Sequence, residues 1–370
     1  MTVKRRTTKP VFIGAVQVGG DAPVVVQSMT STNTSNILET VDQIARLEEA
    51  GCEIVRLAVP DGKAADALPD IRKQSPVPLI ADIHFDHRLA LRAIEGGADA
   101  IRINPGTMGR EHLASVIEAA RRKNVVIRIG INAGSLQKDI LEKHGGPTAD
   151  ALVESALRTI AFFEDRGFGA LKLSLKSSDV GTMIAACRGI AGKTDYPLHL
   201  GVTEAGGLVS SAVKSSIGLG VLLSEGIGDT IRVSITGDPL QEMPVAWGIL
   251  RALDIRKRGP DIISCPTCGR CEIDLPALVA EVEARLSGMK EYLKIALMGC
   301  VVNGPGEAAE ADIGIAGGRR SGVLFKKGTM VKKVAEEHFV DALMEEIRRM
   351  VTEEPRPPAG PAGNHRTQER

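Results

Sequence analysis

The feature of this sequence that most restricts its fold is a regular alternation of short apolar runs and amphipathic stretches over the first 255 residues. The apolar runs predict eight strands, at Val24–Met29, Glu53–Val59, Leu79–His84, Ala100–Asn104, Val126–Asn132, Ala170–Lys176, Leu198–Thr203 and Thr230–Ser234. Helical patterns lie between them, such as Ile37–Ala50, Arg88–Gly96, Glu111–Lys123, Asp150–Arg166 and Leu208–Ser224. A strand and a helix repeated eight times in about 250 residues predict an α/β fold of the (β/α)8 TIM-type barrel class. A doubly wound open sheet is the alternative, which the lack of a Gly-x-Gly-x-x-Gly turn disfavours.

Within several of these strands, one face is polar. Successive strand side chains point to opposite faces, so Arg102 and Asn104 share a face, as do Arg128 and Asn132. Other strands repeat the pattern with Asp82 and His84, with Lys172, Ser174 and Lys176, with His199 and Thr203, and with Arg232 and Ser234. We expect the apolar residues to face the helices and the polar residues to face the lumen near the C-terminal mouth, where such barrels place their sites. Lys172 lies deeper in its strand, and we expect it in the barrel core.

Several cations are predicted to converge on the lumen, namely Arg56, Arg102, Arg128, Lys176 and Arg232. A single buried cation is usually a satisfied core group. Several in one cavity repel one another and lose hydration, unless an anion lies among them. The pattern therefore predicts a strongly anionic small molecule as the ligand, most simply a diphosphate.

The composition narrows the classes of function. The formal net charge is +0 and aromatic residues make up 3% of the chain, which argues against nucleic acid as a partner because such surfaces are basic and stack bases on aromatic rings. No apolar run approaches the roughly 20 residues that span a bilayer. The run Val11–Val16, which follows a basic start, is too short for the core of a signal peptide. We therefore expect a cytoplasmic protein that does not contact membranes.

The pattern changes after Arg258-Gly259-Pro260. The order predicted there is a strand at Asp261–Ser264, a helix at Asp274–Leu286, strands at Tyr292–Met298, Asp312–Ala316 and Gly322–Phe325, and a final helix from about Thr329 to Met350. We therefore expect a barrel domain at residues 1–255 and a small α+β domain at 256–350. Residues 351–370 are rich in Pro, Gly and charge without periodicity, which predicts a disordered tail.

Four of the six cysteines lie in this second domain, at Cys265, Cys268, Cys271 and Cys300. A Cys-x-x-Cys pair fits zinc, a redox dithiol or an iron–sulfur cluster. Structural zinc normally needs a second pair of ligands, whereas Cys300 stands alone in a glycine-rich loop, whose N–H groups can approach cluster sulfurs. The spacing favours an iron–sulfur cluster and allows a set of four cysteine ligands. Cys52 and Cys187 are scattered in the barrel and receive no role.

Two long motifs identify a family. Ser264-Cys-Pro-Thr-Cys268 followed by Gly299-Cys-Val-Val-Asn-Gly-Pro-Gly-Glu307 closely resembles the 4-hydroxy-3-methylbut-2-enyl diphosphate synthases of the methylerythritol phosphate route to isoprenoids. Barrel segments that resemble blocks of this family are Val26-Gln-Ser-Met-Thr30, Ala81-Asp-Ile-His-Phe85, Arg102-Ile-Asn-Pro-Gly106, Arg128-Ile-Gly-Ile-Asn-Ala-Gly134 and His199-Leu-Gly-Val-Thr-Glu-Ala-Gly206. The resemblance runs from roughly Arg5 to Met350. The short Asp254–Pro260 connection matches the two-domain bacterial form of the family.

The resemblance implies an iron–sulfur oxidoreductase. Its substrate is 2-C-methyl-D-erythritol 2,4-cyclodiphosphate, whose ring is opened and which loses a hydroxyl and gains two electrons from a [4Fe-4S] cluster, one per chain. The family's ligands map onto Cys265, Cys268, Cys300 and Glu307, in conflict with the nomination of Cys271 by spacing. A carboxylate holds iron less firmly than a thiolate and can yield it to a substrate oxygen, so we favour Glu307. The alternative for Glu307 is a carboxylate at a helix start.

The resemblance also implies roles for the barrel residues. Arg56, Arg102, Arg128, Lys176, Arg232 and Ser234 hold the diphosphate, Asn104 and Asn132 complete the polar wall, and Asp82, His84 and His199 line the mouth. Glu204, just past the seventh strand, resembles the family's acid and is placed to protonate the departing oxygen. Asn303 lies beside the cluster and contacts the substrate.

The resemblance further implies a homodimer, in which the cluster domain of one chain caps the barrel mouth of its partner, and flavodoxin or ferredoxin as the electron donor. Two other hypotheses remain. A non-catalytic electron-transfer or zinc protein would use Cys271 as a fourth thiolate. A barrel enzyme acting on another phosphorylated molecule, such as a pterin-type transferase, would explain the arginines but not the block that ends at Glu307.

Overall fold

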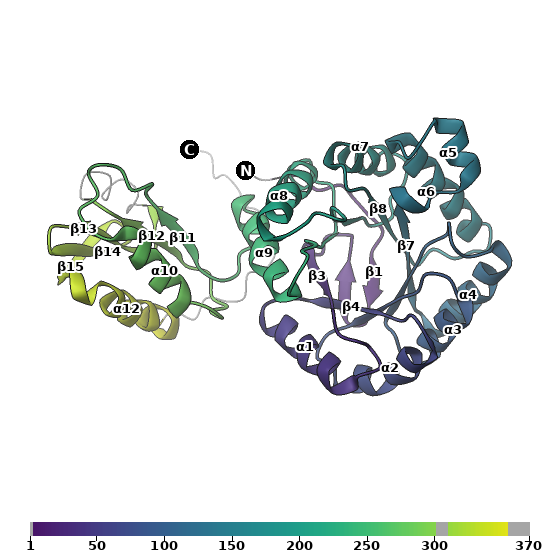
Figure 1. Ribbon diagram of the computed structural model, residues 1–370, viewed down its shortest axis with the longest axis horizontal. Helices are drawn as coiled ribbons and strands as arrows, with labels where there is room; N and C mark the ends of the chain where they lie inside the picture. Colours follow the sequence, from purple (N-terminus) through teal and green to yellow (C-terminus); the bar gives the residue numbers. More distant parts are fainter. Residues whose placement is uncertain (1–2, 301–309, 354–370) are drawn as a thin grey trace, which may run out of the picture. The chain divides into compact units, whose positions relative to one another are not determined.

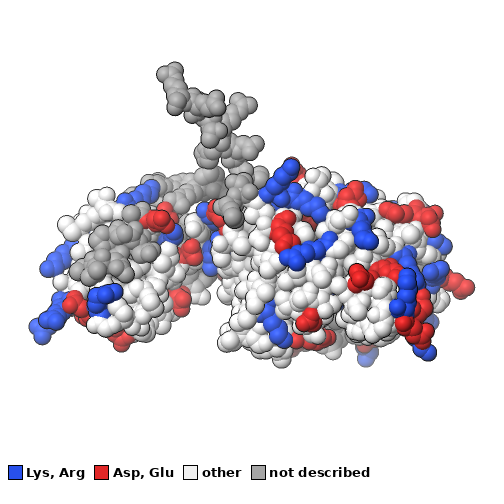
Figure 2. All heavy atoms as spheres, turned by 90° about the horizontal axis from the view of Figure 1, so that it is seen from above, with Lys and Arg blue, Asp and Glu red and all other residues white. Residues whose placement is uncertain are grey.

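The computed structural model describes residues 3–300 and 310–353 of the 370-residue chain. The chain divides into two compact units, with the boundary between Arg256 and Lys257. Each unit has its own hydrophobic core. Among the described residues, no helix combines the length and the apolar character needed to cross a membrane. On the face shown in Figure 2, acidic and basic side chains are interspersed rather than gathered in patches of one sign.

The first unit is a (β/α)8 barrel, as predicted (Figure 1). Its parallel strands are β3 (Val25–Met29), β4 (Ile54–Ala58), β5 (Leu79–Asp82), β6 (Ala100–Ile103), β7 (Val126–Asn132), β8 (Leu171–Lys176), β9 (His199–Leu200) and β10 (Thr230–Ile231). They follow the order β8-β7-β6-β5-β4-β3-β10-β9. A parallel bridge between Leu173 and Leu198 joins β8 to β9. The sheet therefore curves round on itself and encloses a lumen.

Helices surround this sheet (Figure 1). They are α1 (Ile37–Glu49), α2 (Gly62–Gln74), α3 (His87–Glu95), α4 (Arg110–Lys123), α5 (Lys138–His144), α6 (Ala149–Glu164), α7 (Val180–Ala191), α8 (Leu208–Ser224) and α9 (Glu242–Ala252), with short 3₁₀ turns η1 (Ala133–Ser135) and η2 (Pro239–Gln241). Aliphatic residues of the strands pack outward against them, as Ile129 of β7 does in one core cluster with Ile117 of α4 and Leu152 of α6. The outward face of the strands is thus the main core of the barrel.

Polar residues begin several of the outer helices. Asn36, Asp61, Asp86 and Asp179 each accept a hydrogen bond from a backbone N–H in the first turn of α1, α2, α3 and α7. In a barrel of this type the helix N-termini lie at the C-terminal ends of the strands. The positive ends of the helix dipoles therefore surround the mouth and favour an anion there.

A β-hairpin that the sequence pattern did not predict packs on the opposite end of the barrel. It consists of β1 (Val11–Ile13) and β2 (Val16–Val18), joined through Gly14 with φ at +56°. Val11, Ile13 and Val18 form a buried cluster with residues at the starts of barrel strands, namely Val25, Ile54, Ile80, Ala100 and Val126. The hairpin therefore closes the N-terminal end of the lumen with apolar side chains, which leaves the C-terminal mouth as the way in.

The described part of the second unit, residues 257–300 and 310–353, contains a five-stranded sheet and the helices α10 and α12. Its elements are β11 (Asp261–Ser264), α10 (Leu275–Arg285), β12 (Lys294–Met298), β13 (Ile313–Gly318), β14 (Ser321–Lys326), β15 (Thr329–Ala335), the 3₁₀ turn η3 (Glu336–His338) and α12 (Phe339–Glu353). The strand order is β11-β12-β13-β14-β15, with the first three strands parallel and the last two pairings antiparallel. Val282 of α10 and Leu343 of α12 belong to one core with Ile295 and Ile315 of the sheet.

The prediction of one helix from about Thr329 to Met350 is wrong at its start. Residues Thr329–Ala335 form β15, and the helix begins at Phe339. Lys327 and Gly328 have φ of +47° and +75° and make a tight turn, which lets β15 pair with β14. Pairing with the sheet edge outweighs the helical pattern in this segment, because an isolated strand edge would leave its backbone groups without partners.

Candidate active site

The lumen of the barrel holds a cluster of buried cations. Arg102 is 3% exposed, Arg128 1% and Lys176 6%, and only 12% of the Arg56 side chain and 14% of the Arg232 side chain reach the surface. Register explains how β5, β6, β7 and β8 bring these groups together, because Asp82 pairs with Arg102, Arg102 with Arg128, and Arg128 with Lys172. The alternation in the sequence thus directs the cations from strands around the barrel into its lumen.

Asp82 holds two of these guanidinium groups. Its carboxylate lies 3.2 Å from Nη1 of Arg102 and 3.7 Å from Nε of Arg56, and 3.5 Å from Nε2 of His84. Burial alone would raise the pKa of Asp82, but the Arg56 guanidinium, the hydrogen bond with His84 and the Arg102 guanidinium outweigh it and hold that pKa well below its usual range. Asp82 is therefore an anionic support for the cluster.

The lumen contains a second buried carboxylate, Glu242, which the strand pattern does not predict. It is the first residue of α9 and is 1% exposed. Its Oε1 and Oε2 accept hydrogen bonds from Nη2 and Nε of Arg232 at 2.8 and 3.1 Å, and Oε2 also accepts one from Ser28 Oγ at 2.7 Å. A glutamate at a helix start carries no signal in the sequence that it reaches across to a strand.

Burial shifts the protonation of the cations. It lowers the pKa of Arg56 to about 10, against the attraction of Asp82. Burial and the neighbouring Arg128 lower the pKa of Lys176 well below its ordinary value, and the same two causes act on Lys172. Within the described residues, the five basic side chains of the upper lumen, Arg56, Arg102, Arg128, Lys176 and Arg232, have two carboxylates beside them, Asp82 and Glu242. The lumen has a deficit of negative charge that a bound anion would fill.

Several donors in this cluster also have open hydrogen-bonding positions. Arg128 donates through Nε and Nη2 to Ser174 Oγ at 3.1 and 2.9 Å, while its buried Nη1 has no partner in the described part of the chain. The buried Nε of Arg102 is likewise without one. Buried polar groups are nearly always satisfied in native proteins, so these two atoms indicate where an anionic ligand would be held.

Two glycines make room for the cations. A Cβ atom on Gly130 of β7 would lie 2.3 Å from Nε of Arg102, and one on Gly201 would lie 2.9 Å from Nζ of Lys176. Both distances are shorter than any real side chain allows. Glycine on the lumen face of β7 at position 130, and just after β9 at position 201, therefore leaves room for the two cations.

Three other basic residues of the barrel strands and their ends, His84, His199 and Lys172, differ in how deeply they are buried. His84 lies at the mouth with 45% of its side chain exposed. His199 was expected at the mouth but is fully buried, with Nδ1 at 2.8 Å from Thr230 Oγ1, because it is the first residue of the strand β9 and its side chain lies inside the barrel, near Arg128 and Lys176. Lys172 is fully buried, with Nζ 3.5 Å from Gln27 Oε1, and belongs to the core as expected.

The predicted asparagines lie beside the cations. With its amide oriented to satisfy both groups, Asn132 accepts a hydrogen bond from Nη2 of Arg102 at 3.1 Å. Asn104 donates to Ser135 Oγ at 2.7 Å and accepts from the Gly106 N–H at 3.0 Å, so it fastens the loops at the mouth rather than lining the lumen freely.

Glu204 and Ser234 lie after the last two barrel strands. Glu204 is exposed and has φ at +50°, a conformation that a non-glycine residue adopts rarely and that recurs at functional sites. The backbone carbonyl of Ser234 accepts a hydrogen bond from Ser211 Oγ of α8 at 2.7 Å, which ties this strand end to the helix.

A second candidate centre lies in the smaller unit. Cys265, Cys268 and Cys300 line a cavity of about 120 Å³ together with Pro266, Arg270 and Met298. Cys265 directly follows β11 and Cys300 closely follows β12, and these strands are parallel neighbours, so both thiols stand at the carboxyl edge of the sheet. The backbone N–H of Gly299 donates to Sγ of Cys265 at 3.3 Å.

Cys271 does not line this cavity. Its thiol donates to the Ile273 carbonyl at 3.3 Å and packs against the core of the unit. A Cβ atom on Gly299 would lie 2.3 Å from the Cys271 sulfur, so this sulfur packs directly against Gly299, in the space that a larger residue's side chain would take. Asn303 and Glu307, the remaining predicted site residues, lie outside the described residues.

This arrangement of donors suits an iron–sulfur cluster. Cysteine thiolates hold such clusters, and N–H groups that reach the sulfurs set their potential. Each thiolate binds a different iron, so the sulfurs surround a cavity instead of meeting at one point. Within residues 3–300 and 310–353, no three His, Cys, Asp or Glu side chains converge to hold a single metal ion.

Cys52 and Cys187 are buried in the barrel, and burial raises the pKa of each thiol to about 12.

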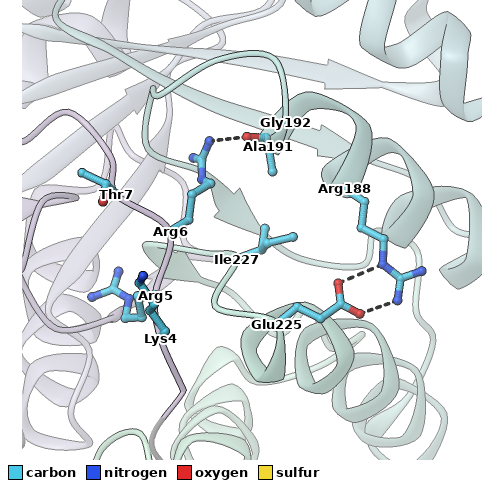
Figure 3. Close-up of a pocket in the computed structure, with 9 residues that line it drawn as sticks. All are labelled: Lys4, Arg5, Arg6, Thr7, Arg188, Ala191, Gly192, Glu225 and Ile227. Carbon is cyan, nitrogen blue, oxygen red and sulfur yellow. Dashed lines mark hydrogen bonds and ion pairs between the residues drawn. The ribbon is translucent and has the colours of Figure 1, made fainter.

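A further cavity of about 440 Å³ lies at the other end of the barrel (Figure 3). The chain segment Lys4–Thr7 lines it, together with residues from the C-terminal ends of α7 and α8. Arg6 donates to the carbonyls of Ala191 and Tyr196 and thereby fastens the end of α7. Arg188 and Glu225 form an ion pair beside it. These cations already have protein partners, so this cavity is less suited to an anionic ligand than the lumen.

Two domain models of one protein family match most of this chain. The GcpE TIM-barrel domain matches residues 8–247, and the GcpE protein C-terminal domain matches residues 261–349. The chain belongs to the GcpE family. This GcpE chain is 58% identical over 349 residues to the 4-hydroxy-3-methylbut-2-en-1-yl diphosphate synthase (flavodoxin) of Nitratidesulfovibrio vulgaris, covering 94% of this chain and 90% of that protein.

Other relatives agree with this placement. The 4-hydroxy-3-methylbut-2-en-1-yl diphosphate synthase (flavodoxin) of Caldanaerobacter subterraneus is 56% identical over 355 residues, covering 96% of the GcpE chain and 100% of the relative. The dihydropteroate synthase of Stenotrophomonas maltophilia has a TM-score of 0.49 and 12% identity over 67% of this chain and 98% of its own, which is too distant to bear on function. The curated relatives, which carry the name 4-hydroxy-3-methylbut-2-en-1-yl diphosphate synthase (flavodoxin) over nearly the whole chain, do not favour the alternative of a pterin-type transferase.

Proposed function

We propose that this chain catalyses the reductive ring opening and dehydroxylation of 2-C-methyl-D-erythritol 2,4-cyclodiphosphate to 4-hydroxy-3-methylbut-2-enyl diphosphate. The curated relatives that carry this synthase name span nearly the whole chain. The observation that carries the proposal is the pairing of a lumen with excess positive charge and a cavity lined by three cysteines in one chain.

The overall reaction balances as follows. The carbon–oxygen bond to the 2-phosphate breaks, the 3-hydroxyl leaves as water, a carbon–carbon double bond forms, and two electrons and two protons are consumed. A [4Fe-4S] cluster, one per chain, would supply the electrons. We propose Cys265, Cys268, Cys300 and Glu307 as its ligands, with Asn303 beside it. The exclusion of Cys271 from the cavity supports this ligand set.

The barrel residues would bind and orient the diphosphate. Arg56, Arg102, Arg128, Lys176 and Arg232 would donate charge-assisted hydrogen bonds to its oxygens, each worth about 1.5–3 kcal/mol. The open donors on Arg128 and Arg102 support this role. Asp82, Asn132 and Ser174 would keep the guanidinium groups in place before the ligand arrives, while His84 and Ser234 would complete the wall at the mouth. Asn104 would fasten the loops there, and the buried His199 would support the cations from within the barrel.

Glu204 would deliver a proton to the departing hydroxyl oxygen. Its exposed side chain, which follows β9 at the C-terminal end of the barrel strands, supports this role, because barrels of this type place their reacting groups there. Replacement of Glu204 by Gln would then lower kcat with little effect on the affinity for diphosphate.

We further propose a cytoplasmic homodimer in which each active site is shared, with residues 1–255 as the substrate-binding domain, 256–350 as the cluster domain and flavodoxin or ferredoxin as the electron donor. Complementation tests the shared site. A Cys300→Ala chain and an Arg128→Met chain, each inactive alone, should regain activity on mixing, because the mixed dimer contains one intact site. A mixture that stays inactive would contradict the shared site.

Anaerobic turnover tests the reaction itself. The chain, reconstituted with iron and sulfide, should convert the cyclic diphosphate in the presence of an artificial reductant. Cys265→Ser should remove both the cluster absorbance and turnover, whereas Arg128→Met should remove turnover and keep the absorbance. A reconstituted chain that leaves the substrate unchanged would refute the proposal.

A further inference from the structure

The position of the buried Glu242 carboxylate, beside a site for an anionic ligand, is electrostatically unfavourable for binding of that ligand. A negative charge beside a site for an anionic ligand weakens binding of that ligand by Coulomb repulsion. Yet Glu242 is buried at the lumen wall and takes both Nε and Nη2 of Arg232. If Glu242 supports binding of the anion, its favourable contribution to the binding free energy must exceed this Coulomb repulsion.

The geometry of its hydrogen bonds to Arg232 can provide this favourable contribution. The two hydrogen bonds form a bidentate fork, which fixes the guanidinium plane as well as its position. Ser28 Oγ of β3 donates to Oε2 at 2.7 Å and the Ile235 N–H lies 3.5 Å from Oε1, so the carboxylate is itself held from two other segments. Arg232 is thus fixed before any ligand binds, with Nη1 directed toward Met29 Sδ at 3.6 Å.

The same sulfur atom links this arrangement to Arg56. Nε and Nη2 of Arg56 lie 3.1 and 2.9 Å from Met29 Sδ, so Arg56 and Arg232 share one neighbour. Asp82 holds the opposite side of Arg56 at 3.7 Å. The two guanidinium groups therefore stand side by side, each supported by its own buried carboxylate.

We infer that Glu242 is a positioning residue, which fixes Arg232 as one arm of the anion-binding cluster. The inference rests on the proposed binding of a diphosphate in the lumen. An unheld arginine would lose much rotamer freedom on binding, and holding it in advance removes that loss. Glu242 touches neither substrate nor cofactor and acts only through Arg232.

Binding of inorganic pyrophosphate, measured by calorimetry without magnesium, tests the inference independently of the cluster and of turnover. Glu242→Gln keeps the size of the side chain and removes the charge, so positioning predicts about tenfold weaker binding. Coulomb repulsion alone predicts the opposite sign, because the variant removes a negative charge near the anion. Tighter binding in Glu242→Gln would therefore overturn the inference.

A double-mutant cycle separates positioning from a general structural role. In an Arg232→Met background, Glu242→Gln should change pyrophosphate affinity by less than about twofold, because the group that it positions is gone. An equal loss in both backgrounds would show that Glu242 acts elsewhere and would overturn the inference. A wild-type chain that does not bind pyrophosphate would overturn it as well, whereas binding without turnover would count only against the proposed reaction.

The chain offers a matched control for the loss of an arginine–glutamate fork. Glu225 accepts hydrogen bonds from Nε and Nη2 of Arg188 at 2.9 and 2.5 Å at the other end of the barrel (Figure 3). Glu225→Gln should leave pyrophosphate affinity unchanged. If Glu242→Gln does not fold, Glu242→Asp keeps the charge and shortens the side chain, and the same cycle with that variant should again show a loss only when Arg232 is present.

Discussion

Replacement of Gly130 by alanine should weaken diphosphate binding without touching a charged group. The new Cβ would lie 2.3 Å from Nε of Arg102 and 3.0 Å from its Cζ and Nη2. Non-bonded heavy atoms settle at about 3.5 Å or more, so the guanidinium must move by about 1 Å. Arg102 would then leave its place 3.2 Å from Asp82 and lose its alignment toward the ligand.

The size of the effect follows from one misplaced charge-assisted contact. Such a contact contributes about 1.5–3 kcal/mol, which corresponds to roughly 10- to 150-fold in affinity. Overpacking of the barrel wall should also destabilise the fold by about 1–3 kcal/mol. Calorimetric titration with pyrophosphate measures the first effect and thermal unfolding the second.

Gly248→Ala is the control for this substitution. Gly248 lies in α9, and a Cβ there meets nothing within 4 Å. It should leave the affinity for pyrophosphate unchanged and raise stability slightly, because alanine favours a helix over glycine by about 1 kcal/mol. If Gly130→Ala binds pyrophosphate as tightly as the wild-type chain does, the assignment of Arg102 to the anion site is wrong.

Three further predictions follow from the same geometry. Arg128→Met should weaken pyrophosphate binding at least tenfold and leave the iron content unchanged, and loss of iron in this variant would argue against a separate anion site in the barrel. Cys271→Ser should keep the absorbance of the reconstituted cluster while Cys265→Ser loses it, since Cys271 lies outside the cavity; the reverse result would overturn the ligand set. Burial lowers the pKa of Lys176 in the free chain, and a bound anion would raise it again, so binding should take up protons and weaken as the pH rises above the lowered pKa. Calorimetry in buffers of different ionisation enthalpy measures this uptake, and proton release would contradict it.

The strand pattern predicted the barrel and its cationic lumen because both depend on local periodicity. Arg102 and Arg128 follow an alternation of two within their own strands, and parallel register then brings them together. The cysteine spacing likewise predicted that cysteines gather at one place in the second unit, where Cys265, Cys268 and Cys300 line one cavity. It could not separate Cys271 from Cys265, because the direction of each thiol depends on how the loop packs against Gly299.

Features that depend on contacts between residues far apart in the chain could not be predicted from the sequence. Glu242 reaches Ser28 from the far end of the barrel sequence, and no local pattern encodes that contact. The β1–β2 hairpin gains its place from apolar residues at the starts of several strands. His199 was expected at the mouth because its strand leads there, but depth within a short strand depends on where pairing begins. Thr329–Ala335 became a strand because a partner edge was available.

The most direct test of the account is an electron count on a single sample. The reconstituted chain is incubated anaerobically with 2-C-methyl-D-erythritol 2,4-cyclodiphosphate and a measured amount of reduced artificial donor, and the product is quantified by mass spectrometry. We expect one 4-hydroxy-3-methylbut-2-enyl diphosphate for every two electrons consumed, and none without the donor. Donor oxidation without this product, or product without donor oxidation, would contradict it.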